Sequence, residues 1–237
     1  MKPIYVPRGK AKEYGDYAIN IYTGCPHECY YCFAPNVLHK VKDDFHKCVE
    51  PRKNIVEEVR KQIEREGITG KLIHLCFTCD PYPKGYDSTP TREIIKILKE
   101  SGNHVQILTK NGRDAERDFD LLDENDWYGV TITNYCTEAE PNAEHPYDRL
   151  QSLYKAKKCG IKTWASFEPV INAAQVLWSL NKDYRAFDKV KIGKLNYHPS
   201  DIDWKEFGEL AESICKGRGI DYYIKESLRA EMERSGG

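Results

Sequence analysis

The sequence predicts an α/β fold built from parallel strands and covering helices, and three observations lead to this class. Strand-like and helix-like segments alternate along almost the whole chain, which is typical of βα units. No low-complexity stretch or linker divides the chain, so we expect one domain over residues 1–237 with a core at about 17–225. The length of 237 residues and the apolar content of 40% are sufficient for a single α/β barrel.

Seven short segments have the length and the β-branched or aromatic content of strands. In order along the chain they are 17–22, 71–77, 104–109, 128–133, 162–167, 189–192 and 222–225. Each is separated from the next by enough residues for a helix, which parallel pairing requires.

Seven further segments have the composition of helices, and glycine follows four of them, as is common at helix ends. In order they are 54–66, 91–100, 115–122, 147–158, 173–180, 204–216 and 227–232. Pro51 and Pro90 precede the first two. Six βα units plus a last short strand and helix predict an incomplete (β/α)6 TIM-type barrel with its helices outside.

The inner face of this barrel is predicted to be polar. Successive side chains of a strand point to opposite faces, and apolar residues such as Ile73, Leu75 and Phe77 are expected to face the helices. The inner face then collects polar side chains: Asn20, His74, Cys76, Thr78, Gln106, Lys110, Thr131, Thr133, Ser166 and Glu168. An unpaired buried polar group costs about 1–3 kcal/mol, so we expect a polar ligand inside the barrel.

Composition excludes several classes of protein. No apolar run approaches the ~20 residues that span a membrane, and 31% of residues are charged. Nine cysteines form no disulfide framework and favour a reducing cytoplasm. The net charge of −1 gives no global attraction to nucleic acid, so nucleic-acid binding would depend on local groups such as Arg8, Lys10 and Lys12.

Three cysteines on one loop carry the strongest chemical signal. Cys25, Cys29 and Cys32 have the spacing Cys-x3-Cys-x2-Cys. Cysteine thiolates are the usual ligands of [4Fe–4S] clusters, and three of them leave one iron open to a small molecule. Zinc is the alternative, because it prefers four ligands and His27 could be the fourth.

This segment resembles the signature of the radical S-adenosylmethionine (SAM) superfamily, with Tyr31 as the aromatic before the third cysteine. The segments 18–25, 78–82 and 107–110 resemble most closely the spore photoproduct lyase-like branch. The resemblance implies a cluster on Cys25, Cys29 and Cys32, with SAM on the open iron. It further implies reductive cleavage of SAM to a 5′-deoxyadenosyl radical, which abstracts hydrogen from an unidentified substrate in the lumen. An electron donor such as flavodoxin or ferredoxin would supply electrons to the cluster.

The resemblance also implies roles for further residues. Thr78, Cys79 and Asp80 would contact the SAM amino group. Lys110 would approach the SAM carboxylate or ribose, and Thr131 or Thr133 would do so from the next strand.

Three residues are candidates for catalysis. Cys76 is the candidate hydrogen donor, with Cys79 as its competitor, and their sulfurs are expected on opposite faces of the strand. Tyr31 matches a tyrosine that relays hydrogen in the lyase-like branch. Glu168 is preferred over Glu138 and Glu226 as the acid or base. The alternative is a purely structural role for Glu168, in an ion pair with Lys194 or Lys110.

Two other functions remain open from sequence. One is repair of DNA photoproducts by a lyase reaction. Against it, Phe33 stands where the lyase-like branch often has tyrosine, and no obvious element would expose a base pair. The other is a non-catalytic zinc or iron–sulfur binding module.

Overall fold

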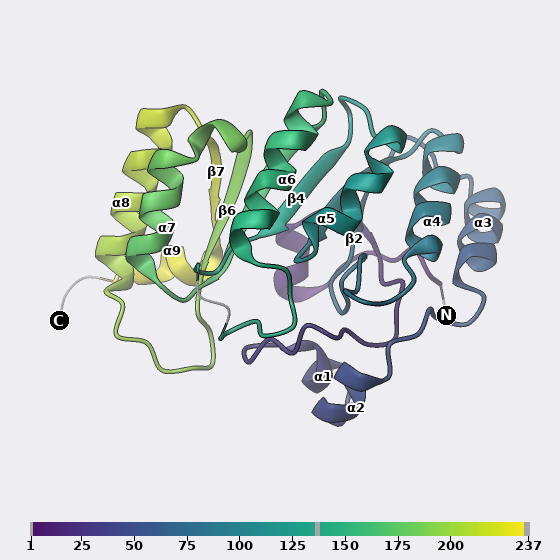
Figure 1. Cartoon of the computed structure of the whole chain (residues 1–237), viewed down its shortest axis with the longest axis horizontal. Coiled ribbons are helices and arrows are strands. Elements are labelled where there is room, and N and C mark those ends of the chain that lie inside the picture. The colour runs from purple at the N-terminus through teal and green to yellow at the C-terminus, as the bar shows by residue number, and fades with distance from the viewer. Residues whose placement is uncertain (1, 136–137, 235–237) are drawn as a thin grey trace.

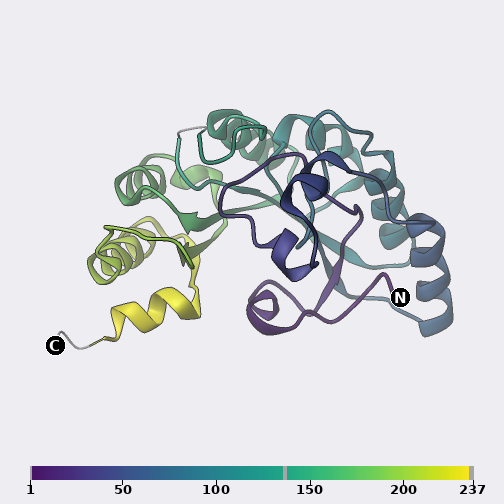
Figure 2. The same ribbon diagram turned by 90° about the horizontal axis from the view of Figure 1, so that it is seen from below.

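The computed structural model describes residues 2–135 and 138–234. Its strands form one sheet in the order β1-β2-β3-β4-β5-β6-β7, and every neighbouring pair is parallel. The strands are β1 (Tyr17–Ile19), β2 (Leu72–Leu75), β3 (His104–Thr109), β4 (Trp127–Thr131), β5 (Lys162–Val170), β6 (Lys189–Lys194) and β7 (Asp221–Ile224). Figure 2 shows the sheet as an open arc. The predicted α/β class with a partial barrel of parallel strands is confirmed.

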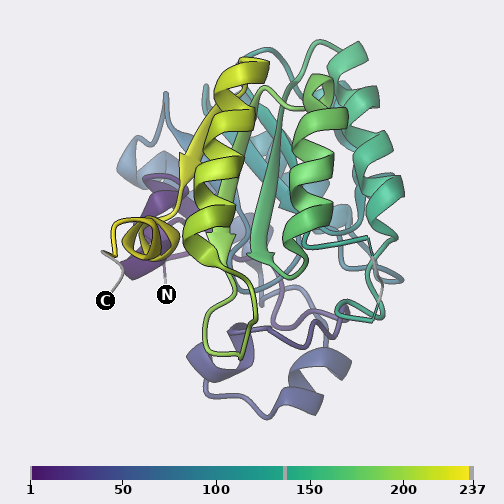
Figure 3. The same ribbon diagram turned by 90° about the vertical axis from the view of Figure 1, so that its left-hand side faces the viewer.

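A row of helices covers the outer face of the arc (Figures 1 and 2). The covering helices are α3 (Ile55–Glu66), α4 (Thr89–Glu100), α5 (Gly112–Ala115), α6 (Pro146–Lys158), α7 (Ala173–Lys182) and α8 (Trp204–Arg218). A last helix, α9 (Glu226–Met232), follows β7. Two short helices, α1 (Ala34–Val37) and α2 (Lys42–Lys47), project beyond the carboxyl ends of the strands (Figures 1 and 3).

The first predicted strand and the third predicted helix are among the elements that differ from the structure. The first strand ends at Ile19 rather than at 22, because the Asn20 side chain turns to accept hydrogen bonds from the backbone of Phe77 and Thr78. The helix predicted at 115–122 is the single turn α5 followed by the 3-10 helix η2 (Glu116–Leu121). Further 3-10 turns are η1 (Gly9–Glu13) and η3 (Tyr184–Ala186).

The outer face of the sheet carries the apolar core. Ile73, Leu75, Val105 and Val130 are fully buried and belong to one contiguous hydrophobic cluster with the covering helices. Their burial follows the period-two alternation of strands. The covering helices therefore pack on an apolar surface and leave the inner face for polar groups.

The alternation fails at the end of β2, where the expected orientations of Cys76 and Phe77 are wrong. The ring of Phe77 lies inside the barrel, with its centroid 4.4 Å from that of His74. The Cys76 side chain belongs to the hydrophobic cluster and is 6% exposed. Strand β2 ends at Leu75, so the period-two rule no longer applies to the residues that follow.

The amino-terminal segment lies in the hollow of the arc. Figure 2 shows the purple turn η1 between the blue and yellow ends of the sheet. The edge strands β1 and β7 do not pair with each other, so this segment lies where further strands would be needed to close the barrel.

Among the described helices, none has the length and apolar character needed to cross a membrane.

Candidate active site

The cysteine loop follows β1 and is held against α2 by its backbone. The Cys25 amide donates to the Phe45 carbonyl at 3.2 Å, and the Cys25 carbonyl lies 2.7 Å from His46 Nδ1. A Cβ atom on Gly24 would lie 2.2 Å from the Phe45 carbonyl oxygen. Glycine at this position therefore permits the close approach that fixes the first cysteine.

The three thiols lie close enough together for their charges to interact. Burial raises the pKa of all three, that of Cys29 to about 12. Interaction with the other thiols raises the pKa of Cys25 and of Cys29 further. The thiolate is the form that binds metals, and a metal cation removes the repulsion between thiolates. Cys25, Cys29 and Cys32 are therefore residues that could hold an iron–sulfur cluster.

His27, the candidate fourth ligand of the zinc alternative, is buried between two protein groups. Its Nε2 accepts a hydrogen bond from the Lys84 backbone at 3.3 Å, and its Nδ1 faces an Asp80 oxygen at 3.5 Å. Burial is the main cause that lowers its pKa to about 3, so the ring is neutral. Nε2 is thus engaged by the backbone, whereas Nδ1 has no hydrogen-bond partner in the described part of the chain, so the zinc alternative stays open at this residue.

A buried network joins the cysteine loop to α6. Tyr31 donates its hydroxyl to Glu140, and Glu140 pairs with Arg149 at 2.6 Å. Burial acts to raise the pKa of Glu140, but the charges of Arg149 and Lys110 outweigh it and hold the pKa below its usual value. The Tyr30 amide also donates to the Ala139 carbonyl at 3.1 Å. The segment around Glu140 therefore clamps the cysteine loop.

Lys110 brings a positive charge to the cysteines. Its Nζ lies 5.7 Å from the centre of the Tyr31 ring. Burial acts to lower the pKa of Lys110, but the charges of Cys29 and Glu140 outweigh it and raise the pKa. The sequence placed Lys110 at the end of β3, and the structure brings it to Cys29 and Tyr31.

Asp80 holds the ends of β2 and β3 together. Its two carboxylate oxygens accept hydrogen bonds from the Tyr82 amide, the Thr109 hydroxyl and the Lys110 amide at 2.9, 2.6 and 2.7 Å. Most of its capacity to accept hydrogen bonds is thereby used. Thr78, in contrast, is 8% exposed and its Oγ1 has no partner in the described part of the chain.

Cys76 and Cys79 are neighbours rather than residues on opposite faces. Both side chains are buried in the same hydrophobic cluster, and the Cys79 sulfur accepts a hydrogen bond from the Tyr22 amide at 3.4 Å. Burial raises the pKa of Cys76. Burial also acts to raise the pKa of Cys79, but the interactions of its sulfur with Cys76 and with backbone amides outweigh burial and lower this pKa. The expectation that these two sulfurs are unrelated is wrong.

Glu168 lies in the lumen beside the amino-terminal segment. It accepts hydrogen bonds from the Tyr14 hydroxyl and from Lys225 Nζ, the latter at 2.8 Å. Lys225 also lies 3.2 Å from a Glu13 oxygen. The predicted ion pairs of Glu168 with Lys194 and Lys110 are wrong, because Lys225 is its partner. Glu138 and Glu226, the other acid candidates, are exposed.

Tyr14 fills the middle of the lumen. Lys191 Nζ lies 4.2 Å from the centre of its ring and Lys225 Nζ lies 4.6 Å from it. The Tyr14 hydroxyl is 3.3 Å from Ser166 Oγ. Burial and the charges of Lys189 and Lys225 lower the pKa of Lys191 to about 7. Tyr14 therefore occupies the part of the lumen next to β5, β6 and the end of β7.

Thr131 and Thr133 are buried on the segment that leaves β4. Thr131 is in register with Ser166, and Arg149 donates to its carbonyl at 2.9 Å. The Thr133 hydroxyl contacts Asn134 at 3.5 Å. Neither threonine is linked to the cysteines by a described hydrogen bond.

Sequence reasoning missed several residues of the site. The period-two pattern of β6 and β7 would have placed Lys191 and Lys225 inside. Tyr14, Glu140 and Arg149 had no such signal, because they come from segments outside the strands.

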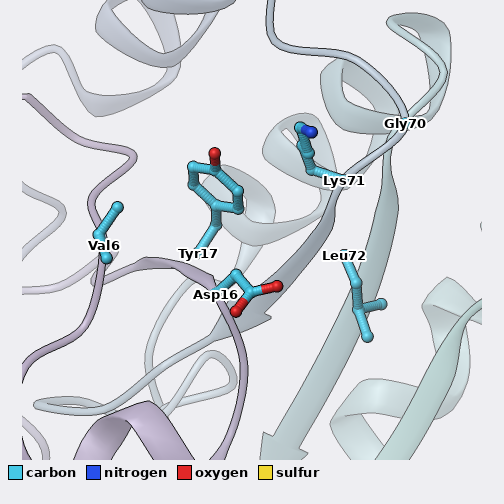
Figure 4. Close-up of a pocket in the computed structure, with 6 residues that line it drawn as sticks. All are labelled: Val6, Asp16, Tyr17, Gly70, Lys71 and Leu72. Carbon is cyan, nitrogen blue, oxygen red and sulfur yellow. The ribbon is translucent and has the colours of Figure 1, made fainter.

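Two cavities lie away from these residues. One of about 470 Å³ is lined by Asp16, Tyr17, Lys71 and Leu72, with Val6 and Gly70, as Figure 4 shows. The other, of about 1020 Å³, adjoins it along residues 2–8. Both lie at the amino ends of β1 and β2, whereas the cysteine loop follows the carboxyl end of β1. They are therefore separate from the candidate active site.

Comparisons with known proteins agree with this arrangement. The family model described as the radical SAM superfamily matches residues 19–171. An uncharacterised protein of Acidianus two-tailed virus is 28% identical over 194 residues, which are 74% of this chain and 63% of that protein. One of Methanocaldococcus jannaschii is 29% identical over 182 residues, 72% of this chain and 64% of that protein. The chain spans less than two thirds of the length of these relatives.

Solved structures with the same fold are also similar. Spore photoproduct lyase complexed with dinucleoside spore photoproduct has a TM-score of 0.69 at 13% identity, covering 93% of this chain and 79% of that one. Streptococcus suis SuiB bound to S-adenosylmethionine has a TM-score of 0.59 at 11% identity, covering 87% of this chain and 46% of that one. At these identities the likeness concerns the fold alone.

Proposed function

The chain belongs to the radical SAM superfamily, and on that premise we propose that it is an enzyme with a [4Fe–4S] cluster on Cys25, Cys29 and Cys32. The observation that carries the proposal is the meeting of three free thiols, one buried and two half-buried, on one clamped loop beside Lys110. When bound, the cluster supplies the electron that cleaves SAM to methionine and a 5′-deoxyadenosyl radical. The substrate is unidentified, and the reaction is a lyase or modification reaction.

The chain's own residues position SAM in this proposal. Thr78 is the best-supported contact, because its buried hydroxyl lacks a partner among the described residues. Lys110 is the next, since its ammonium group faces the cysteine loop and suits a carboxylate. Asp80 and Cys79 support the loop that carries Thr78, because they are already engaged by backbone amides. Thr131 and Thr133 remain predicted contacts from the β4 side.

Glu168 is proposed as the acid or base of the lumen. The Tyr14 hydroxyl and the Lys225 ammonium group hold its carboxylate in place. Tyr31 is proposed as a relay, with its hydroxyl proton directed at Glu140 in the absence of substrate. Cys76 remains a candidate hydrogen donor, and a substrate radical would reach it only after its contact with Cys79 opens.

The compartment and the electron donor belong to the proposal as well. The eight cysteines in the described residues are free thiols, which fits a reducing compartment such as the cytoplasm. A small carrier such as flavodoxin or ferredoxin is proposed to deliver the electron.

Anaerobic reconstitution with iron and sulfide tests the function. We expect a brown protein with about four irons per chain that forms 5′-deoxyadenosine from SAM when dithionite is added. Cys25→Ala, Cys29→Ala and Cys32→Ala should each lose the charge-transfer absorbance and the product. Cys48→Ala, which removes an exposed cysteine outside the triad, is the matched control and should retain both.

Three outcomes would decide against the proposal or refine it. A reconstituted protein that binds zinc but no iron would favour a binding module. A full cluster without SAM cleavage would exclude the proposed chemistry. If the same assay converts a thymine-dimer DNA back to thymines, the reaction is the repair reaction.

A further inference from the structure

An exposed apolar patch lies immediately outside the cysteine loop. Phe33, Val37 and Val41 are 53%, 60% and 67% exposed. Phe33 and Val37 are four residues apart on the turn α1, so they share one face, and Val41 immediately precedes α2. We call these three side chains, with the neighbouring Lys40 and Lys42, the α1 surface. Figures 1 and 3 show that α1 and α2 stand apart from the barrel.

The α1 surface is adjacent to a proposed cluster ligand. Cys32 is half-buried, whereas Cys29 is buried at 6% exposure. Phe33 follows Cys32 directly and forms the outer edge of the loop. The rate of electron transfer falls steeply with distance, so a carrier that rests on Phe33 would be separated from the ligand sulfur by little more than one residue.

The charges around the patch are suited to an acidic partner. The segment 40–47 carries three lysines and two aspartates. Asp43 lies 3.5 Å from Lys47, and both Lys40 and Lys42 are exposed. This segment is therefore net positive, although the whole chain carries −1. Complementary charge raises the rate of encounter between carriers and their partners.

We propose that the α1 surface is the docking site of a small acidic electron-transfer protein that reduces the cluster. The inference rests on the proposed function and adds the partner's place of contact. Three exposed apolar side chains with basic neighbours fit such a partner, because electron-transfer complexes bury less than about 1,200 Å² of total surface. A second copy of this chain is the competing occupant, and the experiment separates the two.

Binding is measured first, on the full chain without metal, with oxidised flavodoxin as the probe. The double substitution V37E/V41E and the single substitution Lys42→Glu place negative charge on the α1 surface. We expect each to weaken flavodoxin binding by about tenfold in calorimetry at low salt. Leu210→Glu, on the exposed face of α8, is the matched control because Leu210 is 45% exposed; it should leave binding within twofold of wild type.

Turnover gives the second readout. With dithionite, which needs no docking site, all variants should form 5′-deoxyadenosine at the wild-type rate. With reduced flavodoxin or a reduced ferredoxin, V37E/V41E and Lys42→Glu should be slower by about tenfold. Loss of the dithionite rate in the variants would indicate damage to the cysteine loop and would contradict a docking role.

The remaining outcomes overturn the inference in distinguishable ways. If the wild-type protein binds neither carrier, or if the α1 variants bind them unchanged, the docking site is elsewhere. Dimers of wild type that dissociate in V37E/V41E would assign the surface to a second copy. If dithionite yields no 5′-deoxyadenosine from wild type, the proposed function fails first, and the docking site with it.

Discussion

His74 is completely enclosed in the lumen, in contact with one polar neighbour. Its Nδ1 lies 3.0 Å from Gln106 Nε2, and its Nε2 has no partner among the described residues. Burial, with a smaller contribution from Lys191, lowers its pKa to about 3. The folded protein therefore keeps this ring neutral at pH values where an unfolded chain would protonate it.

This shift predicts a defined acid sensitivity. Because the folded pKa lies below the ordinary value of 6.5, the stabilisation is complete above pH 6.5 and is lost as the pH falls toward 3. The free energy of unfolding should fall by at most about 1.4 kcal/mol per pH unit through this histidine. His74→Gln should flatten the fall in urea unfolding between pH 7 and 4. The exposed His198→Gln is the control, and an equal effect of both variants would refute this origin.

Single residues also show what the sequence could and could not predict about the site. The spacing of Cys25, Cys29 and Cys32 predicted a shared ligand, because residues on one short loop must lie close together. Tyr14 and Glu140 were missed, since their contacts to Glu168 and Tyr31 join segments 154 and 109 residues apart. Contacts at that separation depend on the complete fold rather than on a local pattern.

At the scale of elements, a glycine of β4 leaves the space that a tryptophan of β5 fills. A Cβ atom on Gly129 would lie 2.2 Å from the Trp164 indole nitrogen. That nitrogen donates to the Ile107 carbonyl at 3.0 Å. The indole ring therefore covers Gly129 and bonds to β3, so it ties three strands together.

Gly129→Ala is expected to destabilise the protein by about 1–3 kcal/mol, because the new methyl group displaces a buried ring. Gly217→Ala is the matched substitution at an exposed position of α8. A Cβ atom added there would have no neighbour within 4 Å outside the backbone of its own helix. This substitution should stabilise by about 0.5–1 kcal/mol through helix propensity. Denaturant unfolding measures both. A Gly129→Ala protein as stable as wild type would mean that Trp164 has room to move.

Elements were predictable in proportion to their length. The strands and long helices were found because period-two and glycine signals extend over many residues. The short helices α1 and α2 were missed, since helices of four and six residues have little intrinsic stability and form through contacts with the rest of the protein. The docking inference depends on these two, so the sequence alone did not reveal it.

At the scale of the whole molecule, the amino-terminal segment completes the barrel. Glu13 and Tyr14 contact residues of β5, β6 and the end of β7, on the far side of the arc from β1. The open sheet is thus bridged by the chain's own beginning. Lys191 and Lys225 depend on this segment for a carbonyl and a carboxylate.

Removal of residues 2–14 should destabilise the protein by about 3 kcal/mol, because it leaves buried Lys191 without its carbonyl partner and takes one of two carboxylates from Lys225. It should also shift Trp164 fluorescence to longer wavelength, since Tyr14 packs 6.0 Å from that ring. Removal of Lys2 and Pro3 alone is the control and should change neither quantity much. Unchanged fluorescence after the longer deletion would show that Tyr14 does not seal the lumen.

This bridge also sets an order of events during synthesis. Glu13 leaves the ribosome long before Lys191, which lies 178 positions later, and at about 5–20 residues per second the interval is roughly 9 to 36 seconds. Throughout that interval the newly made thiols at 25–32 are unsheltered by the later strands. Any factor that loads iron, and any oxidant that would spoil the thiols, meets them in this window.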